Sequence, residues 1–324
     1  METVELRPMT LGELLDRTFR LYRSHFLLFV SIMAIPAAFS VPANVLALTF
    51  QGSFMNSIAA NPGHPPVLPS LDLILGLVLA YGLLIVIYGV TYSIAVAAAT
   101  TAVADVYLGR GSTLHGAYGK IRGRFWRLMG VVGNVFIRAA GLLVLVMAAM
   151  FGVTAALQRV GQSSPGTLAV LGLGLLALVF AYLGAMVWAV YLVLRYAVSI
   201  PVLMLEDLGV LASIRRSIFL TRGRRGHIFL TLLVAAVIAY VGIAVFQLPF
   251  LVVTMVATLQ GHWPPWLAFA ASLSGAVGSA LSGPVSMIAI VLLYYDVRIR
   301  KEAFDLQFMM ASLDDRAPAT GSLA

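Results

Sequence analysis

Residues 73–104 read LILGLVLAYGLLIVIYGVTYSIAVAAATTAVA and contain no charged side chain. About 20 apolar residues in a helix cross a bilayer core of about 30 Å, so this stretch alone predicts a transmembrane span. Five further stretches have the same character: residues 26–50, 128–157, 168–194, 228–259 and 267–295. Pro36 and Pro42 predict a kink in the first of them, or a shorter span. The sequence therefore predicts an all-α membrane protein with six transmembrane helices.

The composition excludes the ordinary soluble classes. The chain is 61% hydrophobic and only 10% charged, with a mean hydropathy of +0.98. A soluble domain is about 45–50% apolar and about 25% charged, and about a quarter of the unfolded surface stays exposed even in a fold of about 300 residues. We therefore exclude a soluble globular enzyme and a disordered chain. With no cysteine, disulfides, thiolate metal sites and cysteine nucleophiles are excluded too.

The basic residues lie almost entirely on one side of the predicted spans. Of the 21 Lys and Arg residues, all but Arg138 and Arg159 precede the first span or follow an even-numbered one. By the positive-inside rule, a multi-pass protein with this pattern has both termini in the cytoplasm. We interpret the net charge of +8 as orientation and contact with anionic lipid at the cytoplasmic face, rather than as nucleic-acid binding.

The predicted cytoplasmic segments have helical patterns of their own. Thr10-Leu11-Gly12-Glu13 has the spacing of a capping box. Apolar residues then recur at helical spacing, as they do again after Thr113 and around Ile214, which predicts amphipathic helices lying in the membrane interface. We divide the chain into a cytoplasmic amphipathic helix (1–25), a six-span domain (26–295), and a cytoplasmic helical extension with a disordered tail (296–324).

A threefold repeat is one interpretation of this order. Each even-numbered span is followed by an acid: Asp105, then the Glu206–Asp207 pair, then Asp296. Three two-span units of about 90–100 residues, each opened by an amphipathic helix, would fill the chain. The alternative is that any six-span protein with a cytoplasmic N-terminus places basic residues after every second span.

Three stretches resemble a known family: LRPMTLGELLDRTFRLYRSHF at 6–26, VLMLEDLGVLASIRRSIFLTRGR at 202–224 and LLYYDVRIRKEAFDLQ at 292–307. They look like the membrane domain of bacterial glycerophosphoryl diester phosphodiesterases, over nearly the whole chain. The resemblance implies that this protein lies in a bacterial cytoplasmic membrane and shares the family's fold. It implies less about function, because the shared motifs reflect membrane topology and not chemistry. In the family's namesakes this domain precedes a soluble phosphodiesterase. Only 29 residues follow Tyr295, too few for a catalytic barrel of about 250 residues, so we expect no enzyme activity.

The chain shows no catalytic constellation. Its five histidines are scattered, and neither a zinc motif nor a nucleophile elbow occurs. We expect no catalytic, cofactor-binding or metal residues. The candidate polar or lipid-contacting residues are Arg138, Asn134, Asp105, Arg122, Arg124, Arg224 and Arg225.

Arg138 falls inside the third apolar stretch, and an intramembrane charge is a functional candidate. One interpretation is an arginine that binds an anion or a lipid headgroup inside the bundle, beside Asn134. The alternative makes residues 127–138 an interfacial helix, with the crossing made by residues 139–157.

Small residues recur every fourth position in two spans. One stripe holds Gly89, Ser93, Ala97, Thr101 and Asp105, and the other holds Ala271, Gly275, Ser279 and Gly283. Small residues at this spacing let helices approach closely. Tight packing within the chain is the main interpretation, and dimerisation or a polar path is the alternative.

Two functions follow as hypotheses. The first is a non-enzymatic membrane protein that engages lipid, or organises a protein partner or a second copy of itself, at the cytoplasmic face. The second is a transporter or channel for a small or lipidic solute. A polar cavity lined by Arg138, Asn134 and Thr101 would favour transport, a dry bundle would favour a scaffold, and a lipid site between spans would favour lipid handling.

Overall fold

The computed structural model describes residues 9–59, 71–107, 110–160, 165–259 and 264–302, and it has no β-strand within these ranges. The long helices are α2 (Phe26–Ala59), α3 (Leu71–Tyr107), α5 (Phe125–Val160), α6 (Pro165–Tyr196), α9 (Arg225–Leu259) and α10 (Pro265–Glu302). Six segments are long and apolar enough to cross a membrane, the fourth of them running from α6 through α7 (Ser199–Glu206). The predicted all-α fold with six candidate spans is confirmed.

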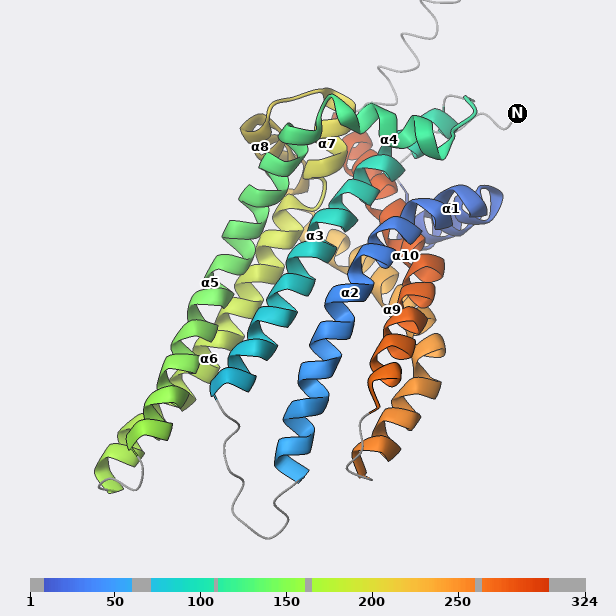
Figure 1. Ribbon diagram of the computed structural model, residues 1–324. Coiled ribbons are helices and arrows are strands. Elements are labelled where there is room, and N and C mark those ends of the chain that lie inside the picture. The colour runs from blue at the N-terminus through green and yellow to red at the C-terminus, as the bar shows by residue number, and fades with distance from the viewer. Residues whose placement is uncertain (1–8, 60–70, 108–109, 161–164, 260–263, 303–324) are drawn as a thin grey trace, which may run out of the picture.

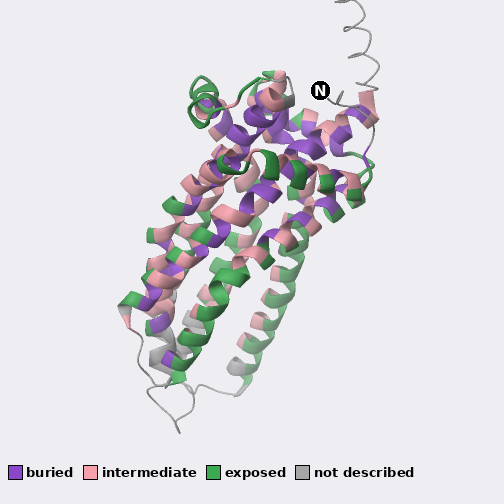
Figure 2. Ribbon diagram, turned by 90° about the vertical axis from the view of Figure 1, so that its right-hand side faces the viewer, coloured by how far each residue is buried: buried purple, intermediate pink, exposed green. Residues whose placement is uncertain are grey.

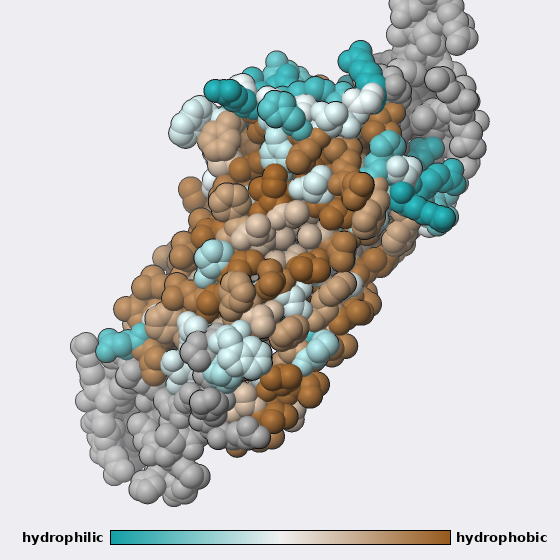
Figure 3. Space-filling view, turned by 45° about the vertical axis from the view of Figure 1, so that its right-hand side comes forward, coloured by the Kyte–Doolittle hydropathy of each residue, from teal (hydrophilic) through white to brown (hydrophobic). Residues whose placement is uncertain are grey.

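Four short helices gather at one end of the bundle: α1 (Leu11–Ser24), α4 (Leu114–Arg122), α7 and α8 (Val210–Thr221) (Figure 1). Most of the basic residues lie there, so we call it the basic end. Between it and the opposite end, the surface is a broad apolar belt (Figure 3). Met9 and the end of α10 meet at the basic end, where the Met9 amide donates to Asp296 Oδ1 at 2.8 Å.

The starts of the short helices follow the local sequence. The Thr10 hydroxyl accepts from the Glu13 amide and the Glu13 carboxylate accepts from the Thr10 amide, so the predicted capping box is confirmed. The Thr113 hydroxyl caps α4 by accepting from the Gly116 amide. Each cap satisfies backbone donors that a helix start leaves without an internal partner.

Helix α10 is the centre of the bundle. It packs against α9, α2, α3 and α1, whereas α5 and α6 pack mainly against each other. Fully buried side chains such as Met287, Ile288 and Leu292 lie on α10 towards the basic end, where most buried residues gather (Figure 2). Side chains on the outer parts of α5 and α6 are exposed, including Leu145 and Phe180. The α5–α6 pair is therefore joined to the rest mainly at the basic end.

Two helix ends differ in detail from those expected. Helix α2 runs through Pro36 and Pro42 to Ala59, so of the two alternatives for this span, a kink or a shorter helix, the shorter helix is wrong; in a membrane, adjustments of the surrounding helix and its neighbours can satisfy the carbonyls that a proline frees. The fourth span was expected to end at Leu194, but the chain turns at residues 197–198 and continues as α7. Val202 and Leu203 of α7 are fully buried, so this segment belongs to the core.

The short helices dock on the bundle. Helix α1 buries Leu14 and Thr18 and packs on α10, while α4 buries Ala117 and Ile121 and packs on α3. Phe19 on α1 stays 43% exposed. The order of short helix, span, span occurs three times among the described elements, but α7 follows only the second set. The threefold repeat and the interfacial position of the short helices stay predictions, and the predicted tail from residue 303 lies outside the described residues.

Candidate functional site

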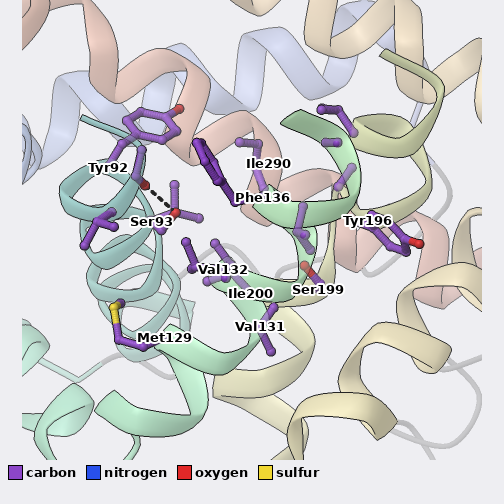
Figure 4. Close-up of a pocket in the computed structure, with 18 of the residues that line it drawn as sticks. Tyr92, Ser93, Met129, Val131, Val132, Phe136, Tyr196, Ser199, Ile200 and Ile290 are labelled. Carbon is purple, nitrogen blue, oxygen red and sulfur yellow. Dashed lines mark hydrogen bonds between the residues drawn. The ribbon is translucent and has the colours of Figure 1, made fainter. Parts of the chain in front are cut away.

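A cavity of about 470 Å³ lies between α3, α5 and the α6–α7 segment. Small-molecule sites usually measure about 300–1,000 Å³. Residues from six helices line it, among them Tyr92 and Ser93 of α3, Met129, Val132 and Phe136 of α5, Tyr196 of α6, Ser199 and Ile200 of α7, and Ile290 of α10 (Figure 4), with Leu232 of α9 as the sixth helix's contribution. We call it the central cavity.

Helical spacing builds two walls of the central cavity. On α5, Met129, Val132 and Phe136 lie three and four residues apart, so they share one face of the helix. The turn after Tyr196 brings Ser199 of α7 to the same space. Gly89 and Gly133 belong to the walls, and a Cβ added at either would meet nothing within 4 Å. These two glycines therefore leave open volume.

The central cavity offers few free polar atoms. Its polar side chains are Tyr92, Ser93, Tyr196 and Ser199. Ser93 donates to the Gly89 carbonyl at 2.6 Å, and the Tyr92 and Ser286 hydroxyls are 3.0 Å apart. Tyr196 accepts from Arg138 at 3.3 Å. With most of its hydrogen-bonding capacity used within the protein, the cavity suits hydrocarbon better than a hydrophilic solute.

Arg138, Asn134 and Thr101 line neither the central cavity nor a second cavity described below. Arg138 is exposed on α5, which continues through this position without a break. Asn134 is half-buried, and its Oδ1 atom is buried without a hydrogen-bond partner. Thr101 donates to the Ala117 carbonyl at 3.2 Å and thereby ties α3 to α4. Neither of these two cavities therefore supplies the polar path through the three residues that would favour transport.

The predicted acids and bases at the basic end form ion pairs between elements. Lys120 of α4 lies 2.6 Å from Asp105 of α3. Arg124 and Arg127 lie 2.9 and 3.1 Å from Asp207, after α7. The hydrogen bond and charge of Arg124, followed by those of Arg127, lower the pKa of Asp207. The Asp207 carboxylate therefore stays ionised, and its ion pairs persist, at any pH above the ordinary carboxyl pKa. The pairs are lost only when the pH falls through the lowered pKa.

The remaining predicted arginines differ in exposure. Arg122 and Arg224 are exposed. Arg225, the first residue of α9, is partly buried, and its guanidinium carbon lies 4.8 Å from the centre of the Tyr191 ring. Among these candidates, Arg225 alone stacks on an aromatic ring within the described chain.

A polar network that the sequence analysis missed joins α7, α8 and α10. Arg216 of α8 lies 2.9 Å from Glu206 and also pairs with Glu302. The hydrogen bond to Glu302 is the largest cause that raises the pKa of Arg216, so its guanidinium stays charged. Tyr294 of α10 donates to Glu206 at 2.9 Å. Tyr294 lies 88 residues after Glu206 in sequence, and Glu302 is likewise distant from Arg216, so no local pattern indicated the network.

A second cavity of about 540 Å³ lies between α2, α3, α9 and α10. Its lining is more polar than that of the central cavity, with Asn44, Tyr88, Gln247 and Ser279 among others. Tyr92, Leu232 and Ile290 line both cavities. Three shared side chains therefore separate the two spaces.

The two stripes of small residues have different surroundings. Ala97 and Thr101 of the first stripe are buried, whereas Gly89 and Ser93 line the central cavity. In the second stripe, a Cβ on Gly275 would meet Gln247 of α9 and one on Gly283 would meet Met33 of α2. The second stripe thus packs within the chain, as the main interpretation predicted. No group of three metal-ligating His, Asp or Glu residues occurs among the described positions.

The fold and the apolar cavity define a polytopic helical membrane protein. Residues 174–308 match the family described as the membrane domain of glycerophosphoryl diester phosphodiesterase. The predicted resemblance is confirmed over that part of the chain, which includes the middle and closing stretches but not the opening one. Neither the search of curated proteins nor the search of solved structures finds a match.

Proposed function

We propose that this protein is a non-enzymatic membrane protein that binds lipid between its spans. The observation that carries the proposal is the central cavity, whose apolar walls lie within membrane-spanning helices. In a bilayer, the hydrocarbon available to such a space is a lipid acyl chain. Since the cavity's hydroxyls are largely bonded within the protein, the cavity binds a lipid acyl chain in preference to a sugar, an amino acid or an ion.

The proposal includes an orientation, with the basic end in the cytoplasm. The uneven distribution of Lys and Arg supports it through the positive-inside rule. Exposed apolar side chains at the basic end, such as Trp126 (83% exposed) and Leu211 (57%), suit contact with the adjoining headgroup region. Because the chain has no cysteine, a single cysteine placed at the exposed Arg122 tests the orientation. It should react with a membrane-impermeant maleimide only after the cells are opened; reaction in intact cells would reverse the orientation.

Filling the central cavity should remove the bound lipid. Gly133→Leu places a side chain into open space in the cavity wall, because a Cβ there meets nothing within 4 Å. We expect the purified variant to retain about tenfold less phospholipid in native mass spectrometry, as a loss of about 1.4 kcal/mol of binding free energy would produce.

The matched control is Gly172→Leu on α6, which also meets nothing within 4 Å but is not among the cavity-lining residues. It should retain lipid like the unmodified chain. Equal retention by both variants, with both folded, would contradict the proposal.

Transport of a lipid is the second candidate function. The observation that favours it is the side-by-side arrangement of the central and second cavities, which share Tyr92, Leu232 and Ile290. Rotation of these side chains would join an apolar space to a more polar one. In proteoliposomes, transport would move a fluorescent phospholipid between the two leaflets, which binding alone does not do.

A further inference from the structure

The second cavity, between α2, α3, α9 and α10, carries an inference beyond lipid binding in the central cavity. Its volume of about 540 Å³ is that of a small-molecule site, and all its lining residues lie within membrane-spanning segments. They extend along α9 from Leu232 to Gln247, which is about four turns of helix. An elongated space inside the spans suits a lipid better than a compact solute.

The walls of the second cavity carry hydrogen-bonding side chains well inside the spans. Of its polar lining residues, Gln247 lies nearest to a helix end, and it is 12 residues before Leu259, or about 18 Å of helix. The amides of Asn44 and Gln247 can each donate and accept hydrogen bonds, and the Tyr88 hydroxyl adds a further donor. A ligand with oxygen atoms therefore finds partners at a depth where the surrounding solvent is hydrocarbon.

One wall is built from the second stripe of small residues. Gly275, Ser279 and Gly283 of α10 all line the second cavity. The Nε2 atom of Gln247 lies so close to Gly275 that a Cβ there would collide with it. The missing side chain of Gly275 thus lets the amide of Gln247 lie over α10, at the wall of the cavity.

The four helices around the second cavity offer no counter-charge for an ionic ligand. No Asp, Glu, Lys or Arg occurs at residues 24–71, 73–104 or 226–295, and every lining residue is uncharged. Burying a charge without a partner is far more costly than burying a polar group that forms hydrogen bonds. The phosphate of a phospholipid is therefore disfavoured in this cavity, and an uncharged polar group is favoured.

The second cavity reaches the lipid-facing surface of the protein. Ile85 of α3 and Tyr240 of α9 line it, and they are 57% and 72% exposed. The surface of the spans around such positions is the broad apolar belt (Figure 3). A ligand can therefore enter sideways from the bilayer, and its hydrocarbon can extend back into the bilayer.

We propose that the second cavity binds an uncharged glycerolipid of the diacylglycerol class. Such a lipid has one hydroxyl and two ester carbonyls but no charge, so it can leave the headgroup plane and reach this depth. The ester carbonyls accept hydrogen bonds from the amides of Asn44 and Gln247, and the hydroxyl pairs with Tyr88. The acyl chains fill the apolar part of the cavity and leave it between Ile85 and Tyr240.

Photolabelling of the full-length protein in detergent tests the proposal. The probe is a diacylglycerol whose acyl chain carries a diazirine, and the competitors are dioleoylglycerol and the phosphatidic acid with the same two chains. These competitors differ only where a phosphate replaces the hydroxyl. We expect dioleoylglycerol to compete about tenfold better, because the phosphate would enter without a counter-charge. Equal or better competition by phosphatidic acid would overturn the proposal.

A matched pair of variants tests the amide in the cavity wall. Asn44→Leu removes one amide at nearly constant side-chain size and should lower labelling about fivefold, as the loss of a hydrogen bond of about 1 kcal/mol would. Asn134→Leu is the same replacement on α5, at a residue that lines neither cavity, and it should label like the unmodified protein. Equal loss in the two variants would overturn the proposal.

A second variant separates binding from folding. Ala236 lines the second cavity and not the central one, and Ala236→Phe fills space there while every polar group stays in place. It should lower labelling in a protein whose thermal unfolding midpoint is unchanged. Undiminished labelling of both Asn44→Leu and Ala236→Phe would overturn the proposal. Equal competition by oleyl alcohol, which has a hydroxyl but no ester, would overturn the assignment to a glycerolipid.

The result is separable from that for the central cavity. Gly133 does not line the second cavity, so Gly133→Leu should lose retained phospholipid and keep the preference for dioleoylglycerol over phosphatidic acid. Asn44→Leu should retain phospholipid like the unmodified chain. Loss of the preference in Gly133→Leu would place the uncharged lipid in the central cavity and overturn its assignment to the second.

Discussion

Replacing Asp296 by alanine should be among the most destabilising single changes in this protein. The Asp296 side chain is fully buried, and it accepts from the Met9 amide at 2.8 Å and from Arg300 Nε at 2.9 Å. His227 Nε2 lies 3.5 Å from its other oxygen. Removing one partner of a buried charged pair usually costs about 3–5 kcal/mol, because the other charge is left uncompensated. We expect a clearly lower midpoint of thermal unfolding in detergent.

The same substitution should also release α1, because Asp296 and Arg300 hold the chain at Met9. Limited proteolysis should cut before Phe26 earlier than in the unmodified protein. Asp207→Asn is the control: it removes a carboxylate whose side chain is 58% exposed, it suits the left-handed backbone at this position, and exposed pairs contribute little. If the two variants unfold at the same temperature, Asp296 does not anchor the ends of the described chain.

Gly278→Val is expected to disrupt the α9–α10 pair. A Cβ at Gly278 would lie 3.1 Å from Cα and 3.3 Å from the carbonyl oxygen of Ile243. Because these are backbone atoms of a packed helix, they cannot move aside as a side chain can. Overpacking of this kind typically costs about 1–3 kcal/mol, which should appear as a lower unfolding midpoint and as aggregation during purification.

Gly172→Val provides the comparison for Gly278→Val. It adds the same side chain to another membrane-spanning helix, at a position where the Cβ meets nothing within 4 Å. Its unfolding midpoint should match that of the unmodified protein. Equal destabilisation by both variants would show that glycine flexibility matters here and close helix contact does not.

The six spans could be predicted from sequence because length and apolarity decide them one stretch at a time. The capping box at Thr10 could be predicted for a similar reason, since its partners are three residues apart. Contacts between helices depend on how each helix is rotated about its axis as well as on the spacing of small residues along it. The stripe through Gly275 and Ser279 identified a packing face of α10, yet the glycine closest to another backbone is Gly278, which is outside the stripe.

The candidate sites were harder to predict. Val132 and Phe136 are ordinary residues for a lipid-facing helix, and only the positions of α3 and α7 make them cavity walls. Arg138 was a candidate because a charge in an apolar stretch is conspicuous, with an interfacial position as the alternative, and its side chain is exposed.

Site-specific photo-crosslinking tests the central claim, lipid binding in the central cavity, most directly. A photoreactive phenylalanine analogue replaces Phe136, whose side chain lines the cavity (Figure 4), or Val187, which is 71% exposed on the outer surface of α6. After purification in detergent and washing away of loosely held lipid, illumination should attach a phospholipid at position 136 and little at 187. Equal attachment at the two positions, or none at 136, would contradict a lipid held between the spans.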